Sequence, residues 1–179
     1  MNGWVIAPVA QIPVWLLDVD GVINALRAGW SAAPETVQIW SPADNYDYRL
    51  RYEPRLVDAI REIHVSGRAE VVWCTTWCSE ADLLEEKFGL PPLAKAFTER
   101  FTGEAASRAK VAAAREVIAA GRRLVWTDDV EVERHAEECE PWAADGRALL
   151  IGPNPSRGLR PRHVQEIEEF LRVGLEAPG

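Results

Sequence analysis

Short apolar runs that lead into polar residues are the feature of this sequence that most limits its fold. Three of these runs are Val14–Leu17, residues 70–74 and residues 123–127, and a fourth is Ala148–Ile151. Bounded apolar runs of this length are typical of strands that are buried on both faces of a parallel sheet. The sequence therefore predicts a buried sheet, with acidic or hydroxyl-bearing residues directly after most of its strands.

The segments between these runs have the pattern of helices. A helix is expected after Glu53-Pro54, because apolar residues fall on one of its faces and Gly67 follows its end. Further helices are expected over residues 79–88, 104–120, 130–139 and 163–172. Strand and helix alternate, which predicts an α/β fold with an open, mostly parallel sheet and right-handed crossovers. Ligands of such sheets bind beyond the carboxyl ends of the strands.

Residues 22–53 interrupt this alternation. They contain two β-like pieces, residues 37–40 and Tyr46–Tyr52, and Asp44-Asn45 between them is typical of a hairpin turn. Neither a linker nor an internal repeat divides the chain. We therefore expect a single domain over residues 1–179, with a hairpin inserted at residues 22–53.

Composition excludes several other classes of protein. The chain has 179 residues with 28 acidic and 20 basic side chains, and a formal charge of -8 argues against broad binding to nucleic acid or anionic membranes. Three cysteines are too few for a disulfide framework. No apolar run reaches the ~18 residues of a membrane span, and residues 1–17 lack the basic start of a secretory signal. We therefore expect a cytoplasmic protein that does not enter a membrane.

Acidic side chains gather at the predicted carboxyl edge of the sheet. Asp18 and Asp20 follow the first apolar run, Thr75 follows the second, and Asp128-Asp129 follow the third. Three carboxylates in one crevice, those of Asp18, Asp128 and Asp129, would repel one another and raise each other's pKa. A hard divalent cation removes this repulsion, and Mg²⁺ prefers carboxylate, water and phosphate oxygens. The pattern predicts a Mg²⁺ site, and the alternative is that these acids only cap turns and helices.

The same residues resemble the motifs of haloacid dehalogenase-like (HAD) hydrolases. The matching parts are residues 16–22, residues 71–75, Lys110 and residues 124–129. The segments Trp73-Cys74-Thr75-Thr76-Trp77 and Trp126-Thr127-Asp128-Asp129 also resemble the small branch of HAD domains found in Swiss-Army-Knife RNA repair proteins. The resemblance implies a three-layer Rossmann-like core around a mostly parallel sheet.

The resemblance also implies a role for each acidic residue. Asp18 would attack phosphorus as a nucleophile, and an aspartyl-phosphate would form on it. Asp20 would protonate the leaving oxygen and then deprotonate the attacking water, as the equivalent carboxylate does in HAD enzymes that hydrolyse phosphate esters. Mg²⁺ would be held by the side chains of Asp18, Asp128 and Asp129 and by the backbone carbonyl of Asp20.

Thr75, Thr76 and Lys110 would bind the phosphoryl group. The Thr75 hydroxyl and backbone N–H would donate to a phosphoryl oxygen, and Lys110 would add a positive charge beside Asp18. A single helical lysine is usually only a solvated surface residue. Lys110 is nevertheless informative, because the chain contains only three lysines and this one falls in the expected helix.

HAD enzymes select substrates with insertions between the core motifs. The stretch from Thr75 to Lys110 holds one expected helix and a Pro-Pro break, which is too little for a large cap domain. Residues 22–53 fit a hairpin flap. We therefore expect an open site without a large cap, which would take the end of a macromolecule or a small molecule closed in by a partner subunit.

Aromatic and basic residues could select the substrate. Trp30, Trp40 and Trp77 are candidates for the rim of the site, where aromatic rings can stack on a nucleobase; the alternative is that they cover the core. Two arginine clusters, one at residues 49, 51 and 55 and the other at residues 157, 160 and 162, either attract a polyanion or pair with the many glutamates.

The leading hypothesis is a Mg²⁺-dependent phosphatase that acts on phosphomonoesters through an aspartyl-phosphate. The substrate would be a phosphorylated small molecule such as a nucleotide, or a nucleic-acid end phosphate, and the resemblance adds a link to RNA repair. Two alternatives stay open: a non-catalytic HAD domain that binds phosphate or nucleic acid, and a phosphotransferase with an acceptor other than water. The sequence indicates no oligomeric state.

Overall fold

A five-stranded parallel sheet forms the centre of the molecule. The computed structural model describes residues 12–173, so most of residues 1–17, the stretch without the basic start of a secretory signal, lies outside the described residues. The strands lie in the order β5 (Ala94–Lys95), β4 (Glu70–Trp73), β1 (Val14–Leu17), β6 (Leu124–Thr127) and β7 (Ala148–Ile151). The two central pairs, β1 with β4 and β1 with β6, are parallel and in full register. The α/β fold predicted from the sequence is confirmed.

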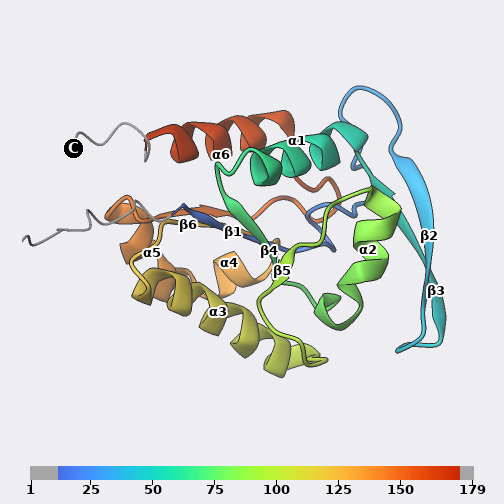
Figure 1. Cartoon of the computed structure of the whole chain (residues 1–179), viewed down its shortest axis with the longest axis horizontal. Helices are drawn as coiled ribbons and strands as arrows, with labels where there is room; N and C mark the ends of the chain where they lie inside the picture. Colours follow the sequence, from blue (N-terminus) through green and yellow to red (C-terminus); the bar gives the residue numbers. More distant parts are fainter. Residues whose placement is uncertain (1–11, 174–179) are drawn as a thin grey trace, which may run out of the picture.

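Helices cover both faces of this sheet (Figure 1). One face carries α1 (Pro54–Val65) and α6 (Pro161–Val173), and the other carries α3 (Gly103–Ala119), α4 (Glu131–Arg134) and α5 (Ala136–Ala144). Alternate residues of each strand point to opposite faces. Trp15 and Trp73 therefore pack towards α1 and α6, whereas Trp126 packs towards α3 and α5.

The three core tryptophans differ in how their indole N–H groups are satisfied. Trp73 donates to the buried carboxylate of Glu85 at 3.0 Å, and Trp15 donates to the hydroxyl of Thr127 at 3.0 Å. The N–H of Trp126 is buried and has no hydrogen-bond partner among residues 12–173. Both Trp73 and Trp126 are fully buried in the core.

A two-stranded antiparallel hairpin lies at one side of the sheet, beside η1 (Cys78–Glu80) and α2 (Ala81–Phe88) (Figure 1). Its strands are β2 (Glu35–Ser41) and β3 (Tyr46–Tyr52), and its turn contains Asn45 in a left-handed conformation with φ 51°. The Glu80 carboxylate accepts bonds from the Ser41 hydroxyl at 2.6 Å and from the Ala43 N–H at 3.0 Å. The hairpin turn is therefore attached to the core of the domain.

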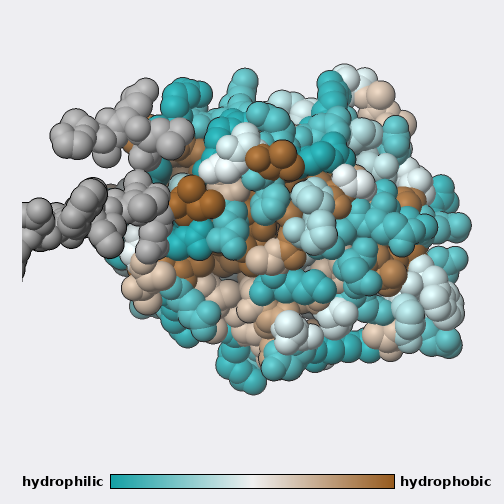
Figure 2. Space-filling view, viewed as in Figure 1, coloured by the Kyte–Doolittle hydropathy of each residue, from teal (hydrophilic) through white to brown (hydrophobic). Residues whose placement is uncertain are grey.

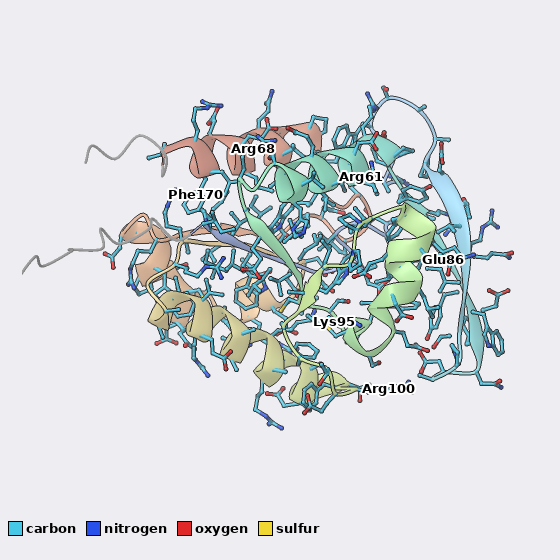
Figure 3. The ribbon with its side chains drawn as sticks, in the orientation of Figure 1. Arg61, Arg68, Glu86, Lys95, Arg100 and Phe170 are labelled. Atoms are coloured by element: carbon cyan, nitrogen blue, oxygen red, sulfur yellow. The ribbon has the colours of Figure 1, made fainter. Side chains whose placement is uncertain are left out.

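Two arginines join neighbouring segments around α2 (Figure 3). Arg100 lies beside the hairpin turn, where it donates to the Ala43 carbonyl at 2.7 Å and pairs with Asp44. Arg61 of α1 donates to the carbonyls of Phe88 and Gly89 at 3.0 and 2.9 Å. These are the last carbonyls of α2, which have no partner within the helix itself.

Two local predictions differ from the structure. The predicted helix over residues 130–139 is two helices, α4 and α5, which meet at His135. α5 also continues through Pro141 to Ala144, although proline usually ends a helix because it lacks an N–H group. The short strand β5 was not predicted, because its two residues are exposed and follow a Pro-Pro break.

The visible surface is mostly hydrophilic. Hydrophobic side chains on the face shown in Figure 2 form small groups between hydrophilic ones. Within residues 12–173, no helix has the length and apolar character needed to cross a membrane.

Candidate active site

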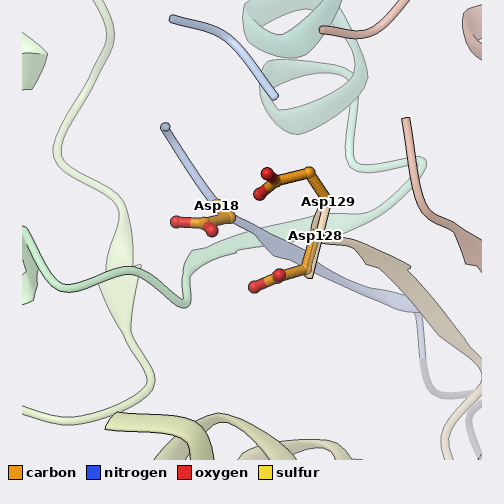
Figure 4. A group of neighbouring side chains, drawn as sticks. All are labelled: Asp18, Asp128 and Asp129. Carbon is orange, nitrogen blue, oxygen red and sulfur yellow. The ribbon is translucent and has the colours of Figure 1, made fainter. Parts of the chain in front are cut away.

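The predicted site residues meet at the carboxyl edge of the sheet. Asp18 directly follows β1, Thr75 comes two residues after β4, and Asp128 and Asp129 directly follow β6 (Figure 4). Because these three strands are adjacent and parallel, their carboxyl ends lie side by side. Lys110 reaches the same edge from α3. The resulting carboxylate cleft has a volume of about 300 Å³ and is lined by Asp18, Asp20, Gly21, Thr76, Lys110, Asp128, Asp129, Val130, Glu131 and Pro155.

Lys110 joins two buried carboxylates. Its Nζ donates to Asp18 Oδ2 at 2.8 Å and to Asp128 Oδ2 at 2.7 Å. Burial raises the pKa of Asp18 above its ordinary value, Lys110 opposes this effect, and Asp128 adds to it. Burial acts to lower the pKa of Lys110, but the two carboxylates raise it above its ordinary value. Lys110 therefore stays protonated, and its ammonium group lies buried between two carboxyl groups.

Asp129 completes a group of three acids. Carboxylate oxygens of Asp18, Asp128 and Asp129 all lie within 4.8 Å of one another. Burial, and then the charge of Asp128, raises the pKa of Asp129. Three carboxylates against the single charge of Lys110 leave a formal excess of two negative charges. Oxygen ligands with this excess fit a hard divalent cation such as Mg²⁺, which the arrangement could hold.

Gly21 allows the loop after β1 to lie close to Asp129 in the loop after β6. Its φ of +73° belongs to the left-handed region, and a Cβ atom built there would lie 2.3 Å from Cγ of Asp129. Any side chain at this position would displace the Asp129 carboxylate. The glycine after Asp20 thus permits close contact between the loop after β1 and the loop after β6.

Asp20 lies on the exposed side of the cleft, and both of its carboxylate oxygens accept a hydrogen bond. Oδ1 accepts from Asn24 Nδ2 at 2.7 Å, and Oδ2 accepts from Trp77 Nε1 at 3.0 Å. Asn24 in turn accepts the N–H of Arg51 in β3 at 2.9 Å. Sequence reasoning missed Asn24, although its position four residues after Asp20 was an available signal.

The two threonines after β4 differ in exposure. The Thr75 side chain is fully buried, and its hydroxyl oxygen accepts the Trp77 N–H at 3.3 Å. Thr76 is exposed and lines the carboxylate cleft. The structure therefore brings Thr76 to the cleft and keeps Thr75 behind it.

None of the three tryptophans named as rim residues lines the carboxylate cleft. Trp77 is buried beneath Asp20 and packs edge-on against Tyr48, with ring centroids 4.9 Å apart. Trp30 donates its indole N–H to the Leu159 carbonyl at 3.0 Å. Trp40 is 53% exposed on β2. Only Trp77 therefore touches a predicted catalytic side chain.

Asp128 has a second contact besides Lys110. Its Oδ1 accepts the N–H groups of Val130 at 3.0 Å and of Glu131 at 2.7 Å, which begin α4. The capping alternative raised for these acids thus applies to Asp128, and capping does not prevent it from facing the cleft. Asp129, the next residue, does not make these bonds.

A buried network behind the cleft was not predicted from the sequence. The Ser107 hydroxyl donates to Glu131 Oε2 at 2.5 Å and lies 3.0 Å from Nε2 of His135. Ser107 is one helical turn before Lys110 on α3, so the network joins α3 to α4. It fixes the relative positions of Lys110 and the Asp128 loop.

Comparison with known proteins agrees with this geometry. Residues 14–164 match the family described as HAD domain in Swiss Army Knife RNA repair proteins. No curated protein and no solved structure matches the chain. The matched range runs from β1 into α6 and includes every residue of the carboxylate cleft. The chain therefore belongs to the family of HAD domains found in Swiss Army Knife RNA repair proteins.

Proposed function

We propose that the protein is a Mg²⁺-dependent phosphatase that hydrolyses phosphomonoesters through an aspartyl-phosphate on Asp18. The observation that carries this proposal is the pairing of two different carboxylates in one loop. Asp18 is buried and bonded to Lys110, whereas Asp20 is exposed and bonded to Trp77 and Asn24. A buried carboxylate beside a cation suits a nucleophile, and an exposed carboxylate suits proton transfer with a leaving group or water.

The reaction then has two steps. In the first, an oxygen of Asp18 forms a bond to phosphorus, the bond from phosphorus to the ester oxygen breaks, and Asp20 gives that oxygen a proton. In the second, Asp20 takes a proton from water, the water oxygen attacks phosphorus, and the bond to Asp18 breaks. Inorganic phosphate and an alcohol are the products, and both aspartates return to their initial state.

The remaining residues of the cleft would position the phosphoryl group. Lys110 places a positive charge beside Asp18 and beside the incoming phosphoryl oxygens. Thr76 faces the cleft, and we assign the contact to a phosphoryl oxygen to its hydroxyl together with the backbone that follows β4. Thr75 would support this loop through its bond from the Trp77 N–H.

A magnesium ion would be held by Asp18, Asp128, Asp129 and the backbone carbonyl of Asp20. When bound, it neutralises charge on the phosphoryl oxygens and on the crowded carboxylates. The donor set supports this assignment, because three carboxylates face one another and Lys110 offsets only one of their charges.

The substrate class that we propose is a nucleotide or a nucleic-acid end phosphate. Two observations support it: the description of the family names RNA repair proteins, and residues 22–53 form a hairpin with no helix among them, which leaves the cleft open. An open cleft admits the end of a polymer more readily than a site closed by a helical cap.

Hydrolysis of an aryl phosphate with Mg²⁺ tests the reaction class. We expect turnover by the wild type, none by Asp18→Asn, and a decrease of about 10²- to 10⁴-fold for Asp20→Asn, the range associated with general acid–base catalysis. Equal inertness of the wild type and Asp18→Asn across aryl phosphates and nucleotides would overturn the proposal in favour of a binding domain. Transfer of phosphate to an added nucleoside in place of water would indicate a phosphotransferase.

A further inference from the structure

A basic hollow lies beside the carboxylate cleft. It has a volume of about 690 Å³ and is formed where the loop after β7 enters α6. We call it the arginine pocket, and define it by Arg27, Ser156, Arg157, Arg160, Arg162 and His163, which are among the residues that line it.

The arginine pocket and the carboxylate cleft share one loop. Pro155 lines the cleft, while its two neighbours in the chain, Asn154 and Ser156, line the pocket. The two hollows therefore lie on either side of one short loop, at the same edge of the domain.

The same loop is seated on the chain that follows Asp20. The Leu159 N–H donates to the Val22 carbonyl at 2.8 Å, and the Arg27 N–H donates to the Ser156 carbonyl at 2.8 Å. A Cβ atom at Gly158 would lie only 2.3 Å from the Val22 oxygen. These contacts fix the position of the pocket relative to the general acid that we propose.

The arginines of the pocket have different partners. Arg160 donates to the Gly29 carbonyl at 2.8 Å and also contacts the carbonyls of residues 27, 28 and 30, so its guanidinium holds that loop. Arg27, Arg157 and Arg162 are exposed. Within residues 12–173, none of these three forms an ion pair with a carboxylate.

The pocket has an uncompensated positive charge. No acidic residue is present among the described residues that line it. By contrast, Arg55, Arg61 and Arg147 elsewhere on the surface pair with carboxylates at 2.6–3.0 Å. Burial is the main cause that lowers the pKa of His163; the charges of Arg162 and Arg160 add to this effect, and Glu166 opposes it.

We propose that the arginine pocket binds a second phosphate group of the substrate, the phosphodiester adjacent to the end phosphate that is hydrolysed. This assignment rests on the proposed phosphatase function and narrows its substrate to molecules with two phosphates, such as nucleic-acid ends. Arg27, Arg157 and Arg162 bind the phosphate oxygens, because a guanidinium fork matches two oxygens of one phosphate. Arg160 keeps the pocket in shape.

Binding to an inactive protein tests this proposal separately from catalysis. Asp18→Asn is titrated with a nucleoside 3′-monophosphate, with a nucleoside 3′,5′-bisphosphate and with inorganic phosphate. We expect the bisphosphate to bind about 10- to 100-fold more tightly than the monophosphate, the gain from one or two hydrogen bonds between charged groups. In the Asp18→Asn protein, the further substitutions Arg27→Gln and Arg157→Gln remove the tighter binding of the bisphosphate. The control substitution Arg172→Gln, at the other end of α6, keeps it.

Catalysis gives a second readout. For the double variant Arg27→Gln/Arg157→Gln, we compare kcat/KM on a 3′-phosphorylated oligonucleotide with kcat/KM on an aryl phosphate. The ratio of the two falls about 10- to 100-fold relative to the wild type, and Arg172→Gln leaves the ratio unchanged.

Three results would overturn the assignment. They are equal affinity for the monophosphate and the bisphosphate, a gain that survives both arginine substitutions, and inorganic phosphate binding as tightly as the bisphosphate. Inertness of the wild type on every phosphate ester would instead defeat the phosphatase proposal, and the binding comparison would still decide what the pocket holds.

Discussion

The carboxylate cleft and the arginine pocket lie on either side of Pro155 and use charge in opposite ways. In the cleft, Asp18, Asp128 and Lys110 are at most 6% exposed, and each charge has a partner within the domain. In the pocket, Arg27, Arg157 and Arg162 are exposed, and the described residues supply them with no carboxylate. Charges of the first kind belong to the fold, so changing them alters stability. Charges of the second kind have no carboxylate partner among the described residues, so we expect that changing them alters ligand binding and not stability.

Removing the buried lysine gives the largest expected effect on stability. Lys110→Met leaves Asp18 and Asp128 buried without the ammonium group that they share, and we expect the free energy of unfolding to fall by about 3–5 kcal/mol. Urea denaturation measures this loss. The loss is smaller at low pH, because protonated carboxyl groups carry no charge to be compensated.

Lys87→Met is the matched control for this lysine. Lys87 is exposed on α2, and its nearest carboxylate, that of Glu86, is 3.9 Å away. We expect a change within about 0.5 kcal/mol. Similar losses for both variants would contradict the view that the charges of the cleft belong to the fold.

Magnesium is expected to have the next largest effect. A cation that binds the folded chain alone stabilises it by about 2.7 kcal/mol at a hundred times its Kd. Thermal unfolding with and without Mg²⁺ measures this stabilisation as a rise in the unfolding temperature. The rise is smaller for Asp129→Asn, because one of the three facing carboxylates is lost. An equal shift in the wild type and in Asp129→Asn would show that the ion binds elsewhere.

Trp77→Phe tests the support of Asp20. The substitution keeps an aromatic ring beneath the cleft but removes the N–H that Asp20 accepts. We expect a loss of about 1 kcal/mol of stability, typical of one hydrogen bond, and about a tenfold lower kcat on an aryl phosphate. Trp40→Phe, on the exposed part of β2, leaves both unchanged. If Trp77→Phe retains full kcat, the indole only fills space.

The smallest expected effect is on the pH dependence of stability, through His163 in the arginine pocket. The pKa of His163 is below its ordinary value of 6.5, so the unfolded chain takes up a proton more readily than the folded chain. Its contribution to stability is complete above that ordinary value and decreases as the pH falls below it. Between about pH 7 and about pH 5, we expect a smaller fall in unfolding free energy for His163→Gln than for the wild type. Equal falls would contradict a lowered pKa of His163 in the folded chain.

The parts of the site that follow from strand register could be predicted from the sequence. Asp18, Thr75 and Asp128-Asp129 each follow an apolar run, and adjacent parallel strands bring their ends together. Lys110 could be placed as well, because its helix directly precedes β6.

The parts that depend on tertiary partners could not be predicted. The choice between Asp128 and Asp129 as a helix cap depends on backbone geometry that the two identical side chains do not reveal. The indole N–H of Trp77 reaches Asp20 across 57 residues of chain. The sequence also left open whether the arginines at residues 157, 160 and 162 attract a polyanion or pair with glutamates, because a formal charge of -8 does not indicate which arginines lack a carboxylate in space.

The edge-on contacts of Tyr46 with Tyr48 and of Tyr48 with Trp77 have a consequence for how this domain responds to its surroundings. The three rings form a continuous line from the hairpin to the indole that holds Asp20. A shift of β3 would therefore change the orientation of the Asp20 side chain. A change in the position of the hairpin would reach Asp20, the residue that we propose transfers protons, through these rings and not through the cleft.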